Sequence, residues 1–94
     1  MHFVYIIYSN EYDQFYVGET ENLEDRLEQH NSGYFPKGFT SKAKDWKLFL
    51  SIGCIDRIHA RKIERHIKKM KSKRYIRNLK EYAEMQTRLL NTFK

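Results

Sequence analysis

Two short stretches rich in aromatic and β-branched residues, 3–8 and 14–18, constrain the fold of this chain most. The polar segment 9–13 separates them, and this pattern predicts a β-hairpin whose loop is longer than two residues. The turn resets the alternation of the strands, so the spacing of Tyr5 and Tyr16 does not show whether they share a face. Gly18 ends the hairpin, where we expect a sharp turn or a close approach to a ligand.

The residues after the hairpin predict one more strand and three helices. The first helix covers 23–30, with Asn22 as its N-cap and Gly33 beyond its end. A loop over 32–45 is punctuated by Gly33, Pro36 and Gly38. A third strand, 46–52, precedes a helix that Asp56 caps and that ends at Met70 or Lys71. Ser72 caps a last helix with the apolar residues Tyr75, Ile76, Leu79, Tyr82, Ala83, Leu89 and Leu90.

This β-β-α-β-α-α order predicts an α+β fold with a small three-stranded antiparallel sheet flanked by helices. With 94 residues we expect a single domain over 1–94, with its core at about 2–80 and a C-terminal helical extension at about 73–91. Cys54 is the only cysteine, which excludes disulfides and multi-cysteine zinc sites. The longest apolar run, 3–8, is too short to span a bilayer, and no signal peptide opens the chain, so we expect a cytoplasmic protein without membrane partners.

Positive charge is concentrated in the second half of the chain. Residues 1–50 carry five Lys/Arg and eight Asp/Glu, a net charge of −3, whereas residues 51–94 carry thirteen and four, a net charge of +9. This asymmetry favours a polyanionic partner, most simply nucleic acid. The alternative is a solubilising basic helix surface.

The first helix has an inward stripe that is half polar. Helical spacing from Leu23 selects Leu23, Arg26, Leu27 and His30. Such a stripe is typical of a helix that lines a site. The alternative is that Arg26 extends to solvent over its apolar stem and His30 sits at the helix end, where positive charge is favourable.

Glu64 is the single acidic residue among the eleven basic residues between Arg57 and Lys80. It lies about 40° from Ala60 around the helix axis, at the edge of the apolar stripe, so it should face the rim of the core. A carboxylate among phosphate-binding cations suits a single divalent metal ion. The alternative is an i,i+4 ion pair with Lys68. We expect His2 and His59 on the surface.

The loop over 32–45 holds side chains suited to nucleic acid. Tyr34, Phe35 and Phe39 can stack on bases or anchor the loop. Hydroxyls and ammonium groups that can hydrogen-bond phosphate are supplied by Thr40, Ser41, Lys42 and Lys44.

Taken in order, these landmarks resemble the GIY-YIG nuclease domain family in its small stand-alone form. The two name-giving motifs appear as Phe3-Val4-Tyr5 and Tyr16-Val17-Gly18. They are followed by Arg26 and His30 on a helix, the Thr40-Ser41-Lys42 loop, the Trp46-Lys47-Leu48 strand, Glu64 with the run 67–72, and Asn78. The resemblance covers residues 2 to about 80. Phe3 replaces the glycine of the first motif, and Glu19 stands where some members have a lysine.

The resemblance implies a phosphodiesterase that uses one Mg²⁺ or Mn²⁺ ion. Glu64 would be the metal ligand and Tyr5 the group that helps to deprotonate water, with Tyr16 positioning water or phosphate, although the two tyrosines could exchange roles. Arg26 would neutralise charge on the phosphate, and His30 would orient or share the proton. Beyond the loop residues, nucleic-acid contacts would come from Lys68, Lys71 and Asn78.

We therefore expect a metal-dependent endonuclease acting on DNA, with RNA as an alternative substrate. No separate recognition domain is expected within 94 residues, which favours cleavage directed by substrate structure over cleavage directed by sequence. One alternative is a non-catalytic nucleic-acid-binding module with the same fold. Another is an interaction domain or homodimer built on an apolar C-terminal helix face that comprises Tyr82, Met85, Leu89, Leu90 and Phe93.

Overall fold

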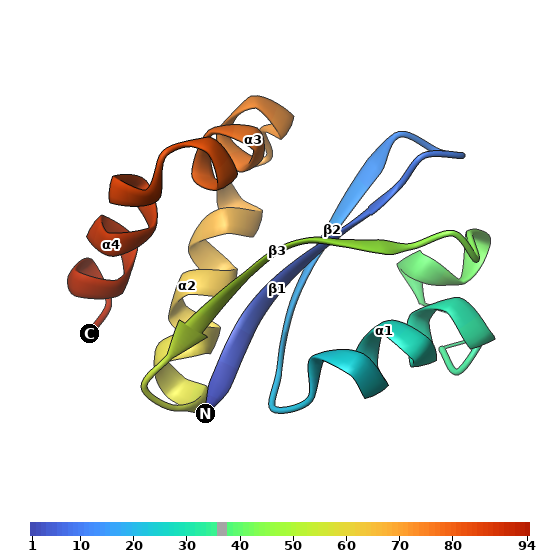
Figure 1. Cartoon of the computed structure of the whole chain (residues 1–94), viewed down its shortest axis with the longest axis horizontal. Helices are drawn as coiled ribbons and strands as arrows, with labels where there is room; N and C mark the ends of the chain where they lie inside the picture. The colour runs from blue at the N-terminus through green and yellow to red at the C-terminus, as the bar shows by residue number, and fades with distance from the viewer. Residues whose placement is uncertain (36–37) are drawn as a thin grey trace.

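The computed structural model describes residues 1–35 and 38–94, so the loop-breaking function expected of Pro36 lies outside the described residues. The elements in chain order are β1 (His2–Ser9), β2 (Gln14–Thr20), α1 (Leu23–Ser32), the 3₁₀ helix η1 (Phe39–Lys42), β3 (Lys47–Cys54), α2 (Arg57–Met70), α3 (Lys73–Glu81) and α4 (Ala83–Thr92) (Figure 1). None of the helices in these described ranges is long and apolar enough to cross a membrane.

The three strands form one antiparallel sheet in the order β2-β1-β3, which confirms the predicted α+β fold. The register pairs Tyr5 with Gly18 and Ile7 with Tyr16. Because Tyr5 and Ile7 are two residues apart, both tyrosines lie on the same face of the sheet. The structure thus decides what the spacing in the sequence left open.

Helices cover both faces of the sheet, α1 on one side and α2 to α4 on the other (Figure 1). The face towards α2 holds the larger apolar cluster, in which Ile6 and Val17 pack with Ile63 and Ile67. The other face holds a smaller cluster in which Tyr5, Ile7, Ala43 and Trp46 pack with Tyr16, Leu23 and Leu27. Since β2 is an edge strand, side chains from both layers can meet at its outer edge.

The predicted helix caps are confirmed. The Asn22 side chain accepts from the Asp25 amide at 3.1 Å, and Asp56 accepts from the His59 amide at 2.8 Å. Ser72 accepts from the Tyr75 amide at 3.1 Å. Gly33 ends α1 with φ at 83°, a left-handed conformation that glycine adopts without steric cost.

The expected last helix is instead two helices. Tyr82 is extended, with φ −113° and ψ 98°, and it separates α3 from α4. The Gln86 side chain donates to the Leu79 carbonyl at 2.7 Å, which satisfies an acceptor that the break frees. The break turns α4 back so that Leu89 is buried against the main cluster.

The predicted C-terminal interaction face packs within the chain. Leu89 is buried, and Met85, Leu90 and Phe93 pack on the main apolar cluster, which leaves Tyr82 exposed. This packing removes the observation on which the interaction-domain hypothesis depended.

The expectation of surface histidines at positions 2 and 59 is wrong. Both side chains are buried. His59 Nδ1 accepts from the Ile55 amide at 3.1 Å, so Nε2 carries the hydrogen and donates to the Leu90 carbonyl at 3.0 Å. His59 therefore joins α2 to α4, and His2 binds Glu19.

For Gly18 the sequence predicts a sharp turn or a close approach to a ligand, and the structure shows that it allows a close approach of the Tyr5 side chain. A Cβ atom at this position would lie 2.5 Å from Tyr5 Cζ and 2.8 Å from Tyr5 Cε1. The Tyr5 ring therefore crosses the backbone of β2 at the residue with which Tyr5 pairs on that strand, and any side chain at Gly18 would displace the ring.

We predict that Gly18→Ala lowers the free energy of unfolding by about 1–3 kcal/mol, the usual cost of overpacking a tight core. Gly53→Ala is the matched control, because a Cβ at that strand glycine meets mainly the flexible Met1 side chain, with Sδ at 3.0 Å. Urea unfolding measures both variants. Equal stabilities of the two variants would contradict the prediction.

Candidate active site

Tyr5, His30 and Thr40 form a buried chain of hydrogen bonds. The Tyr5 hydroxyl lies 2.8 Å from His30 Nε2, and His30 Nδ1 lies 2.7 Å from Thr40 Oγ1. All three side chains are nearly inaccessible to solvent. Since both imidazole nitrogens are engaged, the orientation of the His30 ring is fixed.

Trp46 and Asn31 hold this chain in place. Trp46 Nε1 donates to the Thr40 carbonyl at 2.9 Å. The Asn31 side chain accepts from the Trp46 amide at 2.8 Å and donates to the Trp46 carbonyl at 2.9 Å. Asn31 follows His30 on α1, so the same helix positions the imidazole and the segment that supports it.

Burial shifts the pKa values of Tyr5 and His30 in opposite directions. Desolvation raises the pKa of Tyr5 well above its usual 10; the neighbouring Tyr16 and Glu64 add to that rise, while the guanidinium of Arg26 opposes it. Desolvation, followed by the charge of Arg26, lowers the pKa of His30 to about 4. At neutral pH the site therefore holds a neutral phenol hydrogen-bonded to a neutral imidazole.

Tyr16 and Arg26 lie beside this pair. The Tyr16 ring centroid is 6.3 Å from that of Tyr5 and 5.1 Å from that of His30. Arg26 is half-buried on α1, with its guanidinium carbon 5.9 Å from the Phe35 ring centroid. The predicted stripe of α1 thus faces the site, as expected for a helix that lines one.

Glu64 reaches the same edge of the sheet from α2. Its side chain is only 18% exposed, which confirms the predicted position at the rim of the core. Lys68 Nζ lies 2.8 Å from Glu64 Oε2 and 5.4 Å from the Tyr16 ring centroid. Lys68 therefore links the carboxylate on α2 to the tyrosine on β2. The i,i+4 ion pair between Glu64 and Lys68, which was the alternative expectation, forms as well.

Glu19, which stands where some members of the family that the sequence resembles have a lysine, points away from the two tyrosines. It alternates with Gly18 on β2 and so lies on the face towards α2. Its carboxylate accepts from His2 Nε2 at 2.5 Å and lies 3.8 Å from Arg57 Nε. Its negative charge is therefore paired on the opposite face from Tyr5 and Tyr16.

Thr40 is not placed for the phosphate contact expected of it. Its side chain is 2% exposed and its hydroxyl binds His30, so the structure makes it a positioning residue. Ser41 donates to the Gly38 carbonyl at 2.8 Å. Lys42 and Lys44 are exposed, and Lys42 Nζ lies 4.3 Å from the Phe39 ring centroid.

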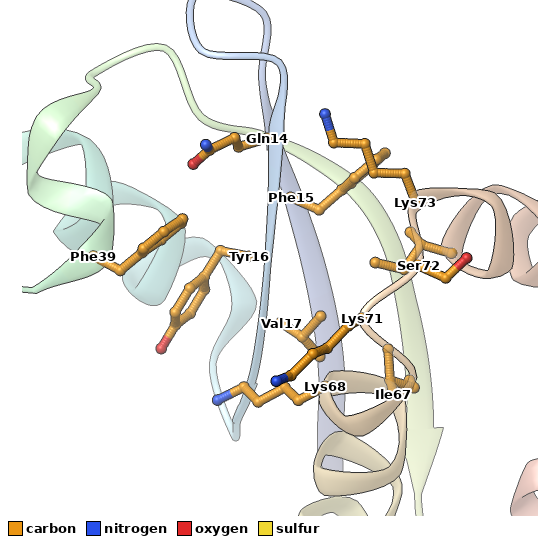
Figure 2. Close-up of a pocket in the computed structure, with 11 residues that line it drawn as sticks. Gln14, Phe15, Tyr16, Val17, Phe39, Ile67, Lys68, Lys71, Ser72 and Lys73 are labelled. Atoms are coloured by element: carbon orange, nitrogen blue, oxygen red, sulfur yellow. The ribbon is translucent and has the colours of Figure 1, made fainter.

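A groove of about 640 Å³ runs along the outer edge of β2 and is hereafter called the β2 groove. Phe39 of η1 and Tyr16 lie on one side of the strand, and the backbones of Lys68 and Lys71 lie on the other, from where Lys68 extends across β2 towards Tyr16 (Figure 2). Its lining residues are Gln14, Phe15, Tyr16, Val17, Phe39, Ile67, Lys68, Lys71, Ser72, Lys73 and Ile76. Asn78 lies on α3 outside this lining, and its contact with nucleic acid stays a prediction.

The sequence did not predict how several residues shape the site. The side chains of Asn31 and Trp46 bind backbone groups of distant residues, and Gly18 acts through its missing side chain. Lys73, which lines the groove and also binds Asp13, is one lysine in a run of basic residues. For Lys73, the sequence indicated a polyanionic partner only through the net positive charge of the second half of the chain.

We predict that Thr40→Val, which removes the hydroxyl but keeps the shape, lowers the free energy of unfolding by about 1–3 kcal/mol, because it leaves His30 Nδ1 buried without a partner. Thr40→Ser keeps the hydroxyl and should retain most of the stability. Chemical denaturation compares the two variants, and a Thr40→Val protein as stable as Thr40→Ser would contradict the prediction.

The lowered pKa of His30 makes stability depend on pH. The unfolded chain binds this proton near pH 6.5 and the folded chain near pH 4, so the stabilising contribution is complete above pH 6.5 and is lost as the pH falls towards 4. We expect the wild type to lose about 1–3 kcal/mol more than His30→Gln between pH 7 and pH 4.5. Urea unfolding across this range measures the difference, and parallel curves for the two proteins would contradict it.

Comparison with known families finds a match to the GIY-YIG catalytic domain over residues 1–79. Comparison with curated proteins and with solved structures finds no match. The matched span covers the hairpin, α1, β3, α2 and most of α3, and so includes Tyr5, Tyr16, Arg26, His30 and Glu64. Members of this family are nucleases, so nucleic acid is the class of substrate that is typical of the family. The chain belongs to the GIY-YIG family.

Proposed function

We propose that this protein is a divalent-metal-dependent endonuclease that hydrolyses phosphodiester bonds in DNA and is directed by substrate structure. The observation that supports this most directly is the meeting of two layers at the β2 edge. Tyr5, Tyr16, Arg26 and His30 come from the face covered by α1, and Glu64 comes from α2 on the other face. A phosphate placed at this edge can contact groups from both layers at once.

Glu64 fits a divalent metal ion. A carboxylate is a preferred ligand of Mg²⁺ and Mn²⁺, and one of its oxygens accepts no hydrogen bond from the part of the chain that the structure describes. Within residues 1–35 and 38–94, no three His, Cys, Asp or Glu side chains come together to hold a metal. A cation at Glu64 would therefore keep water and phosphate oxygens as its other ligands, and it would stabilise negative charge on the reacting phosphate.

Tyr5 and His30 can move the proton of the attacking water. Because Tyr5 retains its own proton at neutral pH, it does not act as a phenolate. Instead, its oxygen takes a proton from water while its own proton passes along the 2.8 Å hydrogen bond to His30 Nε2. This transfer uses the tautomer in which His30 Nδ1 carries hydrogen and donates to Thr40 Oγ1.

Cationic side chains supply the remaining charge. The guanidinium of Arg26 beside Tyr5 neutralises charge that develops on the phosphate. Lys68 and Lys71 lie along the β2 groove, where they can bind neighbouring phosphates, and Ser41, Lys42 and Lys44 extend that surface on the η1 side. Tyr16 lies between these two sides and positions water or phosphate.

One observation favours the non-catalytic binding module as the second candidate. The Glu64–Lys68 pair neutralises the carboxylate without a metal ion. In that case Lys68 and Lys71 would bind nucleic acid, the wild type would not cleave it, and a substitution of Glu64 would have no cleavage to abolish.

We expect Glu64→Gln to reduce metal-dependent cleavage by at least about 100-fold while DNA binding in EDTA is retained, because the variant removes the metal ligand and keeps the basic surface. Cleavage of labelled duplex, single strand, nicked duplex and four-way junction is measured with Mg²⁺, Mn²⁺ or EDTA. Glu84→Gln, at an exposed position on α4, is the matched control and should cleave like the wild type. Binding without cleavage of any substrate by the wild type would favour the binding module.

A further inference from the structure

The β2 groove presents flat aromatic surface next to the reacting groups. The rings of Tyr16 and Phe39 are inclined by only 22° to each other, with centroids 6.2 Å apart. Phe39 is 52% exposed, although it lies on a helix that otherwise supports the buried Thr40. Figure 2 shows the two rings on the same side of β2, and the Lys68 side chain extends from α2 across the strand towards Tyr16. Phe39 is the exposed ring of this pair and Tyr16 is half-buried, and nucleobases stack on exposed aromatic rings.

Positive charge lies at the rim of this groove. Lys71 and Lys73 are exposed on the α2–α3 side, and Lys42 lies over Phe39 on the other. A nucleotide offers the complementary distribution of charge and flat surface, since its base is flat and neutral and its phosphate is anionic. A base in the groove would place its phosphates among these lysines.

The two neutral polar side chains that line the groove, Gln14 and Ser72, each have an oxygen that already accepts a hydrogen bond within the chain. Gln14 Oε1 accepts from Lys42 Nζ at 2.5 Å, and Ser72 Oγ accepts from the Tyr75 amide at 3.1 Å. Few groups therefore remain to read the edge of a base, so the groove would recognise the ring face of a base with little regard to which base it is.

On the basis of the function proposed above, we propose that the β2 groove binds an unpaired nucleobase of the substrate strand, next to the phosphate at Tyr16 and Glu64. In a duplex the ring faces are stacked on one another, and only the base edges are accessible in the grooves. A paired base therefore cannot reach Phe39. The enzyme selects DNA that has an unpaired nucleotide beside the cut, and the groove is the element that makes this selection.

The test uses DNA that contains the fluorescent base 2-aminopurine, either in a one-nucleotide bulge or base-paired in the same duplex, with EDTA present so that binding alone is measured. We expect the wild type to bind the bulged probe more tightly and to quench its emission by stacking, with little change for the paired probe. Phe39→Ala should weaken binding of the bulged probe at least about fivefold, the lower end of stacking contributions. Phe39→Leu, which keeps apolar bulk without a flat ring, should also lose the quenching.

Matched controls separate this groove from the rest of the surface. Tyr34 is an aromatic residue of the same loop that is 64% exposed and lies outside the groove, so Tyr34→Ala should bind like the wild type. Lys71→Ala should weaken binding more than Lys69→Ala, because Lys69 lines a different hollow with Arg65 and His66. Circular dichroism confirms that each variant is folded.

The outcomes distinguish this inference from the nuclease proposal. Equal affinity of the wild type for bulged and paired probes, or loss of binding in Tyr34→Ala equal to that in Phe39→Ala, would overturn the inference even if the protein cleaves DNA. If the protein stacks on the bulged base through Phe39 but cleaves no substrate, the inference about the β2 groove is supported and the nuclease proposal is rejected. Absence of any DNA binding would overturn both.

Discussion

The position of the Tyr5 ring across Gly18 determines where this site can form. A phenol on the central strand would ordinarily point straight away from the sheet, but the missing side chain on the edge strand lets the ring reach outwards over β2. Its hydroxyl then meets His30 and lies within the electrostatic reach of Glu64, which belongs to the opposite layer. Without this crossing, the groups on the two faces of the sheet would be separated by the sheet itself.

The position of the candidate site at the outer edge of β2 explains why a sheet of only three strands can hold it. With three strands in the order β2-β1-β3, one strand lies between the central tyrosine and solvent, and α2 packs beside that strand. A wider sheet on this side would cover the edge and bury the groove. The unpaired edge of β2 is partly protected by lysines from α2 and α3 and by η1, which is a common way to keep an edge strand from pairing with other chains. In the function that we propose, the lysines that protect this edge would also attract the nucleic-acid substrate.

Local signals predicted the elements well, whereas long-range contacts could not be predicted from the sequence. Asn22, Asp56 and Ser72 cap their helices as expected because capping depends on a few neighbouring residues. For the same reason, the helical period correctly placed Arg26 and His30 on the inward stripe of α1 and Glu64 at the rim of the core. The expected phosphate contact of Thr40 failed because its partner, His30, is ten residues away on another element. The break at Tyr82 also escaped prediction, since it depends on α4 packing back onto α2, where His59 binds the Leu90 carbonyl.

The electrostatics of the site favour proton transfer over a preformed base. An anionic Tyr5 would have to be stabilised in a buried place near Glu64, and burial raises its pKa instead. A cationic His30 would have to be stabilised beside Arg26, and its pKa falls to about 4. Arg26 favours the anionic form of Tyr5 and disfavours the cationic form of His30, so one guanidinium acts on both partners. The resting pair is therefore neutral, and it can change charge only when an anionic phosphate near Arg26 and His30 compensates for the new positive charge. In the mechanism that we propose, the pair would be coupled in this way to the substrate, so proton transfer would occur only when a phosphodiester lies at the β2 edge.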